Sequence, residues 1–229
     1  MNDRTFVALA GNIGSGKTTV AKLLSQRLGF ELFDEPVIDN RFLAPYYGDM
    51  RRWSFTLQLE FLIKRVAHHE IIERLPKSCI QDRTLLEDPE IFAKYLHGLG
   101  HMTDSELQLY LEYFERLNRH IQQPSKVIYL QCHDLDVLMR RIHTRGRREE
   151  RAMQAEFLQG LNGYYAALPQ VLKTKHGIPV MTFDVTHFNV HDTVQAEALV
   201  TLVSAFLRED ATPSTMIRGD EGFSQAAAH

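Results

Sequence analysis

The sequence is short of cysteine and of long hydrophobic runs, and each shortage excludes a class of protein. Only two cysteines, Cys79 and Cys132, occur in 229 residues, too few for the disulfide framework of a small secreted domain. They lie far apart near the ends of expected strands, which favours buried thiols in a reducing compartment. No apolar run approaches the ~18 residues that a membrane-spanning helix requires, and the first residues lack the features of a signal peptide. We therefore expect a cytoplasmic protein that does not enter a membrane.

The sequence also lacks a large excess of charge of either sign. Lysine and arginine together number 26 and aspartate and glutamate 29, so the formal net charge is −3. Such a chain has no overall attraction for nucleic acid or anionic membrane, which favours small-molecule partners. With 44% hydrophobic residues, we expect a single domain over residues 1–208. Residues 209–229 are polar and small, and we expect a disordered tail there.

A glycine-rich motif near the start of the chain predicts a nucleotide-binding site. The residues from Gly11 to Thr18 read Gly-Asn-Ile-Gly-Ser-Gly-Lys-Thr and follow an apolar run, as in a P-loop between a strand and a helix. The glycines allow backbone N–H groups to surround phosphate oxygens, Lys17 adds a charge at the outer phosphates, and Thr18 offers Mg²⁺ a hydroxyl. We expect ATP and Mg²⁺ as cofactors, with the nucleotide held by Gly11, Asn12, Ile13, Gly14, Ser15, Gly16, Lys17, Thr18 and Thr19.

Strand-like and helix-like segments alternate along the rest of the domain. This alternation predicts an α/β protein with a five-stranded parallel sheet flanked by helices. Between residues 51 and 75 the apolar residues recur at three- and four-residue steps, which predicts one long amphipathic helix. The expected strands cover residues 5–10, 30–34, 78–82, 126–131 and 178–183. Further helices are expected over residues 103–122, 134–145, 150–175 and 189–208.

Two of the expected strands end in charged residues, at the edge where a parallel sheet binds its ligands. The second strand ends at Asp34-Glu35-Pro36, and Pro36 holds Glu35 extended. Glu35 is a candidate base for the proton of an attacking hydroxyl, and an acid that caps a helix or faces solvent is an equal alternative. The third strand ends at Asp82-Arg83, where the acid suits Mg²⁺ and its waters and the arginine suits an acceptor group.

Six arginines lie within the dozen residues from Arg140 to Arg151. Arginine side chains suit phosphoryl oxygens, so a helix and loop here would form a lid over ATP. Nucleic-acid binding is a second interpretation, which the interleaved glutamates and the acidic net charge disfavour. The third interpretation is that these arginines lie on a solvated helix face.

Five segments of the chain together resemble the successive motifs of the deoxynucleoside kinases. They are the P-loop and residues 34–36, 52–58, 82–88 and 141–150, in family order and at family-like spacing. The segment Asp-Arg-Thr-Leu-Leu-Glu-Asp-Pro is most similar to that of the bacterial deoxyadenosine kinases. The resemblance covers residues 5–207. It implies a P-loop kinase fold with an arginine-rich lid and an ATP-dependent kinase that acts on deoxyribonucleosides.

The resemblance implies catalytic roles for the residues that match these motifs. Glu35 matches the base for the nucleoside 5′-hydroxyl, Arg83 matches the arginine that holds this base and hydroxyl, and Asp82 matches the acid near Mg²⁺. Lys17 keeps its P-loop role as a positive charge at the outer phosphates. The lid arginines around the transferring phosphate match Arg141, Arg145 and Arg147, of which the last two contact the transition state.

The resemblance also implies how the sugar is held. Tyr47 and Glu150 match the pair that hydrogen-bonds the 3′-hydroxyl. The tyrosine also crowds a 2′-hydroxyl and so favours deoxyribose. Tyr46 is a rival for that assignment.

The choice of base rests on Gln58, Arg65 and Asp88. Gln58 and Arg65 are two turns apart in the long expected helix and therefore share a face. A carboxamide matches the amino-bearing edge of adenine or cytosine better than thymine, and the resemblance adds that an arginine and an aspartate here accompany deoxyadenosine, deoxycytidine or deoxyguanosine. A surface glutamine and a helix ion pair are the alternative. Phe92 is expected to wall the base, although an aromatic residue at helical spacing also suits a plain core.

We therefore expect ATP·Mg²⁺-dependent phosphorylation of the 5′-hydroxyl of a deoxyribonucleoside, with deoxyadenosine first and deoxycytidine or deoxyguanosine open. The resemblance suggests a homodimer built on the long helices, and neither nucleic acid nor membrane is an expected partner. A nucleoside monophosphate kinase is one alternative, but its acceptor phosphate requires further cationic groups and none is evident outside the lid. A nucleotide-dependent nucleic-acid-binding module is another, and its binding would depend on salt.

Overall fold

The computed structural model describes residues 4–34, 40–151, 153–208 and 216–217, which contain a parallel sheet of order β2-β3-β1-β4-β5-β6. The five expected strands are confirmed as β1 (Phe6–Ala10), β2 (Glu31–Phe33), β3 (Cys79–Asp82), β4 (Lys126–Gln131) and β5 (Val180–Asp184). A sixth, β6 (Met216–Ile217), pairs with β5 and belongs to the segment expected to be a tail. The rest of residues 209–229 lies outside the described residues.

Helices connect the strands in the expected order. The helix α1 (Lys17–Leu28) follows β1, and α2 (Leu43–Gly48) and the long α3 (Met50–Arg74) precede β3. A π-helix, η1 (Asp88–Ala93), then α4 (Lys94–Gly98) and α5 (Asp104–Asn118) lead to β4. Next come α6 (Leu135–Arg145), the 3₁₀-helix η2 (Arg148–Glu150) and α7 (Ala155–His176), and α8 (Thr193–Arg208) follows β5. The hydrophobic spacing had not revealed the short elements α2, η1 and α4.

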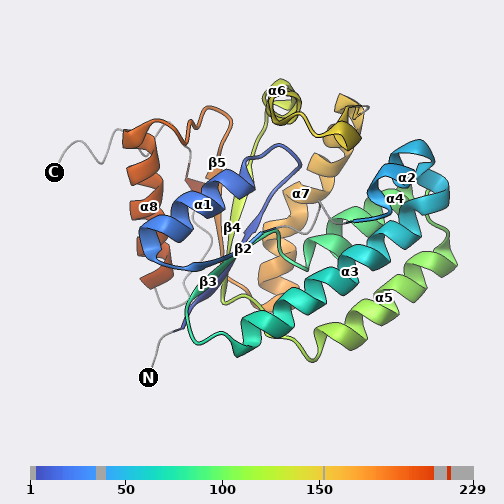
Figure 1. Ribbon diagram of the computed structural model, residues 1–229, viewed down its shortest axis with the longest axis horizontal. Coiled ribbons are helices and arrows are strands. Elements are labelled where there is room, and N and C mark those ends of the chain that lie inside the picture. Colours follow the sequence, from blue (N-terminus) through green and yellow to red (C-terminus); the bar gives the residue numbers. More distant parts are fainter. Residues whose placement is uncertain (1–3, 35–39, 152, 209–215, 218–229) are drawn as a thin grey trace.

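Each face of the sheet has its own apolar layer, because successive residues of a strand point to opposite faces. Ala8 and Ala10 of β1 pack with residues of α3, α5 and α7. Val7 and Leu9 pack instead with residues of α1, α6 and α8. Figure 1 shows α1 and α8 on one side of the sheet and α3, α5 and α7 on the other. A strand covered on both faces reads as a continuous apolar run, as β1 does.

The central strand β1 brings the P-loop to the middle of the sheet. It pairs in parallel with β3 on one side and β4 on the other, so the strand order reverses at β1. Ligands of such sheets bind in the crevice outside the carboxyl ends of the strands at this point. Leu9 lies opposite Asp82 in the register, and the end of β3 therefore lies beside the P-loop.

The two cysteines are free and buried, which confirms the expectation of buried thiols. Burial raises the pKa of both Cys79 and Cys132, so they remain protonated and behave as small apolar groups. Within the described ranges, no helix is both long and apolar enough to cross a bilayer.

Candidate functional site

The P-loop depends on glycines in conformations that other residues adopt only with strain. Gly14 has φ +81°, and a Cβ added to it would lie 2.7 Å from the carbonyl oxygen of Leu138. Gly16, directly before α1, has φ +91°, and no atom lies within 4 Å of its Cβ position. The open space in front of the positive end of α1 leaves room for a phosphate group against backbone N–H groups.

Lys17 and Thr18 present a cation and a hydroxyl at the start of α1. The Lys17 ammonium donates to the carbonyl oxygens of Gly11 and Asn12 at 2.7 and 3.0 Å, which holds it along the loop. The Thr18 hydroxyl donates to Asp82 Oδ2 at 2.5 Å. An adjacent hydroxyl and carboxylate are hard oxygen ligands, and Mg²⁺ binds to such groups together with substrate phosphates. The residues at this position therefore fit Mg²⁺.

One cavity of about 640 Å³ joins the P-loop to α2, α3, the start of η1, the end of α6 and the loop after β5. Gly11, Asn12 and Asp82 hydrogen-bond to Lys17 and Thr18 but are not part of its lining. Glu35 lies outside the described residues. The predicted site residues that line the cavity are Ile13, Gly14, Ser15, Gly16, Lys17, Thr18, Thr19, Tyr47, Gln58, Arg65, Arg83, Asp88, Phe92, Arg141, Arg145, Arg147 and Glu150.

At one end of this cavity, Arg65 and Asp88 form a buried ion pair. Arg65 Nε donates to Asp88 Oδ2 at 2.6 Å, and each side chain is 2% exposed. Burial raises the pKa of Asp88 to about 6, against the opposing attraction of the Arg65 and Arg83 guanidinium groups. Gln58 Oε1 is buried and has no hydrogen-bond partner among the described residues. A buried acceptor in a cavity favours a ligand that brings a donor.

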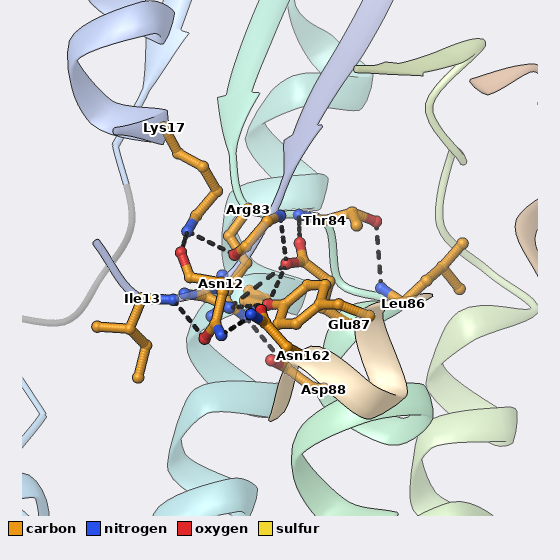
Figure 2. Close-up of polar contacts among 12 residues, drawn as sticks. Asn12, Ile13, Lys17, Arg83, Thr84, Leu86, Glu87, Asp88 and Asn162 are labelled. Atoms are coloured by element: carbon orange, nitrogen blue, oxygen red, sulfur yellow. Dashed lines mark hydrogen bonds and ion pairs between the residues drawn. The ribbon is translucent and has the colours of Figure 1, made fainter. Parts of the chain in front are cut away.

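Arg83 lines the cavity and has a strained backbone conformation. Its φ of +75° is left-handed, which is uncommon for a residue with a side chain and concentrates at functional sites. Its guanidinium lies 4.7 Å from the ring centroid of Phe92 and donates to the Tyr165 hydroxyl at 2.9 Å. Figure 2 shows Glu87 at the centre of the same network, where it accepts from Tyr165 at 2.7 Å and from Arg83 at 3.4 Å.

Two arginines of the expected lid share one carboxylate. Arg145 Nη2 donates to Glu150 Oε2 at 2.6 Å, and Arg147 Nη1 lies 3.5 Å from Glu150 Oε1. The Arg145 side chain is 34% exposed and that of Glu150 is 6% exposed. Because both guanidinium groups line the cavity, they can exchange this carboxylate for phosphoryl oxygens.

Arg141 lines the same cavity but makes different contacts from the other two arginines of the expected lid. Its Nη2 donates to the carbonyl oxygens of Val185 and Phe188 at 2.8 and 3.1 Å, so it holds the loop between β5 and α8. Burial lowers the pKa of this guanidinium. Sequence reasoning missed that part of the cavity, which is lined by Phe188, Asn189, Val190 and His191, because none of these residues belongs to a recognised phosphate-binding or nucleoside-binding motif.

Glu87 and Tyr165 were also missed. Glu87 had one signal in the sequence, its place in the segment 82–88 that resembles a motif of the deoxynucleoside kinases. Tyr165 lies in the middle of α7 at a position that suits a plain core residue, and no local pattern connects it with Arg83.

Tyr46 and Tyr47 both line the cavity, with ring centroids 5.1 Å apart. Tyr46 is buried and its pKa is raised by that burial, whereas Tyr47 is half-buried. Glu150 lines the same cavity. The pairing of Tyr47 with Glu150 at the sugar stays a prediction.

Comparison with known proteins gives concordant results. A family model described as deoxynucleoside kinase matches residues 7–208. The chain is 32% identical to the deoxyadenosine kinase of Dictyostelium discoideum, over 88% of this chain and 78% of that protein. It is 34% identical to the deoxyadenosine/deoxycytidine kinase of Bacillus subtilis (strain 168), over 70% of this chain and 75% of the relative. The structure of deoxyadenosine kinase from M. mycoides with bound dATP matches with a TM-score of 0.75 at 28% identity, covering 90% of this chain and all of that one.

Proposed function

Since this chain belongs to the deoxynucleoside kinase family, we propose that it transfers a phosphoryl group from ATP to the 5′-hydroxyl of a deoxyribonucleoside and prefers deoxyadenosine. One observation carries this proposal. A single cavity contains both a P-loop with room for phosphates and the buried set Gln58, Arg65 and Asp88. A shared cavity holds donor and acceptor close together and limits the access of water.

The donor binds at the P-loop. Its backbone N–H groups and the positive end of α1 attract phosphate oxygens, and Lys17 adds a cation. Thr18 and Asp82 hold Mg²⁺, which when bound neutralises charge on the phosphates. Arg145 and Arg147 exchange Glu150 for the oxygens of the transferring phosphoryl group, whose negative charge they stabilise during transfer.

The acceptor hydroxyl binds at Arg83, which lines the cavity. Phe92 beside the guanidinium supplies an apolar wall for the base. Glu35 is the base for the hydroxyl proton, a role that rests on the sequence motif. In support, Phe33 at the end of β2 lies opposite Gln81 in the register, so that β2 and β3 end at the same edge of the sheet.

The base is selected by hydrogen bonds in a dry pocket. The unsatisfied Gln58 carboxamide oxygen accepts from the amino group of adenine, while its nitrogen donates to the neighbouring ring nitrogen. Arg65 and Asp88 complete the polar edge of the pocket. Thymine has a carbonyl where adenine has its amino group and would leave buried polar groups unpaired. Deoxycytidine presents an amino group beside a ring nitrogen as adenine does, and it remains a candidate acceptor. Deoxyguanosine has a carbonyl at that position and its amino group elsewhere on the ring, and it remains a candidate because of the family resemblance. Tyr47 with Glu150 holds the 3′-hydroxyl of the sugar.

The first test is phosphate transfer from ATP·Mg²⁺ to a panel of deoxynucleosides, ribonucleosides and deoxynucleoside monophosphates. Lys17→Ala serves as the blank. We expect turnover with deoxyadenosine above the other acceptors and none in the blank. Turnover with monophosphates alone would contradict the proposal and identify a monophosphate kinase.

The proposed base has its own test. Glu35→Gln removes the proton acceptor but keeps the side-chain shape, so kcat falls while both KM values change little. An unchanged kcat would exclude Glu35 as the base.

We further propose that two copies of the chain assemble into a homodimer in the cytoplasm. Ile63 and Ile71 on α3 are 64% and 55% exposed, and Leu109 and Tyr113 on the neighbouring α5 are also exposed. Such an apolar patch on two packed helices favours a second protein surface. Sedimentation velocity tests for the dimer. Ile63→Glu should convert the protein to a monomer, whereas Val194→Glu, on the separate helix α8, should leave the dimer intact.

A further inference from the structure

We propose that Glu87 is a positioning residue, which aligns the donor-binding P-loop with the acceptor-binding Arg83 while touching neither substrate. This inference rests on the proposed function, because it assigns the two halves of the cavity to donor and acceptor. Glu87 and its partner Tyr165 are absent from the cavity lining. Any effect of Glu87 on phosphoryl transfer must therefore pass through other residues.

The contacts of Glu87 join three separate segments of the chain. Its carboxylate is completely buried. Oε1 accepts from the Gly11 N–H at 3.1 Å, from the Tyr165 hydroxyl at 2.7 Å and from Arg83 Nη1 at 3.4 Å. Oε2 accepts from the Thr84 N–H at 2.9 Å. Figure 2 shows the carboxylate between the P-loop and the strand end that carries Arg83.

The link to the donor passes through Gly11. Its N–H group donates to Glu87, and its carbonyl oxygen accepts from the Lys17 ammonium at 2.7 Å. Gly11 has little freedom to shift, since its Cβ position lies 2.7 Å from the carbonyl oxygen of Leu130. The position of Glu87 therefore determines where the P-loop begins and where Lys17 is held.

The link to the acceptor passes through both ends of Arg83. Glu87 Oε2 holds the Thr84 N–H, which belongs to the peptide directly after Arg83, while Oε1 contacts the guanidinium. A left-handed backbone at a residue with a side chain persists only where its surroundings hold it. Glu87 is the group that holds the strained backbone and the charged tip of Arg83 together.

The geometry of the network explains why a carboxylate stands at position 87. Each hydrogen-bond partner of the carboxylate described above is a donor, and a buried carboxylate beside a guanidinium is stable only when paired and hydrogen-bonded. Burial and the nearby Glu87 charge raise the pKa of Tyr165, so its hydroxyl stays protonated and donates. A carboxamide at this position can accept only through its oxygen, and its NH₂ group faces a donor.

The experiment compares Glu87→Gln with Glu90→Gln, a matched change of a buried glutamate. Glu90 lies in η1, the helix that Glu87 directly precedes, and pairs with Lys94 and Lys175, and it does not line the cavity. Three quantities are measured with saturating deoxyadenosine. They are kcat per active site, the KM of each substrate, and the fraction of consumed ATP whose phosphoryl group passes to water to give ADP and inorganic phosphate.

For Glu87→Gln we expect kcat to fall about a hundredfold with each KM within about threefold, because small misplacements of reacting groups have effects of this order. The fraction of ATP lost to water rises, since the acceptor hydroxyl is no longer aligned. Glu90→Gln lowers the stability of the fold but leaves kcat and this fraction unchanged. If the two variants behave alike, Glu87 has a merely structural role and the proposal is wrong.

A double-mutant cycle with Arg83→Lys tests the route of the effect. If Glu87 acts through Arg83, the two losses in kcat are not additive. Glu87→Gln then lowers kcat much less in the Arg83→Lys variant than in the wild-type protein. Additive losses would overturn the proposal. Should Glu87→Gln fail to fold, Glu87→Asp keeps the charge and shortens the reach, and it must still raise the fraction of ATP lost to water. A wild-type protein that phosphorylates no nucleoside would instead overturn the proposed function, and this inference with it.

Discussion

Arg65 and Arg145 each donate to a carboxylate at 2.6 Å, but the two ion pairs lie in different surroundings. The Arg65–Asp88 pair is buried on both sides, with each side chain 2% exposed. In the other pair, Glu150 is buried while the Arg145 side chain remains about one-third exposed. Both pairs line the same cavity, so the contrast compares the pair proposed to bind the base with the pair of the proposed lid.

The contrast separates the buried pair, which is proposed to select the base, from the lid pair, which is proposed to exchange its carboxylate for phosphoryl oxygens. A buried charge cannot replace a lost partner with water, so Arg65 and Asp88 must be paired before the nucleoside arrives. Water reaches Arg145 and Arg147, which are partly exposed, and screens their charge. The two arginines can therefore exchange Glu150 for phosphoryl oxygens at a smaller cost than Arg65 could leave Asp88.

The largest expected effect comes from removing a lid arginine. Arg145→Ala should lower kcat on the order of a thousandfold, since an arginine on the transferring phosphoryl group contributes at least that much. Its unfolding free energy should stay within about 0.5 kcal/mol of wild type. Steady-state kinetics and urea unfolding measure the two quantities. Arg148→Ala is the matched control, because Arg148 is exposed and does not line the cavity; a similar loss in both variants would refute the special role of Arg145.

The second effect is on stability, at the opposite end of the cavity. Asp88→Asn leaves the Arg65 charge buried without a counter-charge, which should lower the free energy of unfolding by about 3 kcal/mol. Urea unfolding at pH 7.5 measures it. The double variant Arg65→Met, Asp88→Leu removes both charges and should recover most of the loss. A loss below about 1 kcal/mol in Asp88→Asn would mean that water reaches the pair.

The third prediction concerns pH. Because burial raises the pKa of Asp88 to about 6, the carboxylate is protonated below that value and no longer serves as the charged partner of Arg65. The nucleoside affinity is thus fully present well above about pH 6, is halved at about pH 6 and falls further below it. We expect the KM for deoxyadenosine to rise about tenfold for each pH unit below 6. The KM of Asp88→Asn should not rise in this way as the pH falls. A wild-type KM that stays constant down to pH 5 would rule out the raised pKa of Asp88.

The smallest expected effect is the change in stability when the lid loses its carboxylate. Glu150→Gln frees two arginines that already reach water, so the free energy of unfolding should change by less than about 1 kcal/mol. Urea unfolding in low and high salt checks this value. A loss as large as that of Asp88→Asn would show that the lid pair is as rigid as the buried one.

Much of the fold was predictable because its signals are local. The apolar runs of β1 and β4, the P-loop and the repeated apolar steps of α3 each lie within one stretch of sequence. The π-helix η1 was not predictable, since its six residues, which include Pro89, are too few to show a period. The strand β6 has two residues and pairs only at the sheet edge, a contact that composition does not reveal.

The contacts of the candidate site also divide into those that follow from local sequence and those that do not. Gln58 and Arg65 share a helix, so their common face follows from the spacing alone. The contact of Asp88 with Arg65 crosses from η1 to α3 and was predicted only through the family resemblance. Glu87 was missed because nothing local distinguishes a buried carboxylate from a solvated one.

By itself, the sequence determined that this chain binds a nucleotide through a P-loop in an α/β fold, because strand, glycine-rich turn and helix follow one another along the chain. Its successive motifs also determined the kinase family. Only the tertiary structure decided which charges are buried, that Arg145 and Arg147 share Glu150, and that Glu87 joins the P-loop to Arg83. The bond between Gly11 and Glu87 spans 76 positions. Such a contact forms only when β1 and β3 pair and exclude water, and no local pattern encodes that event.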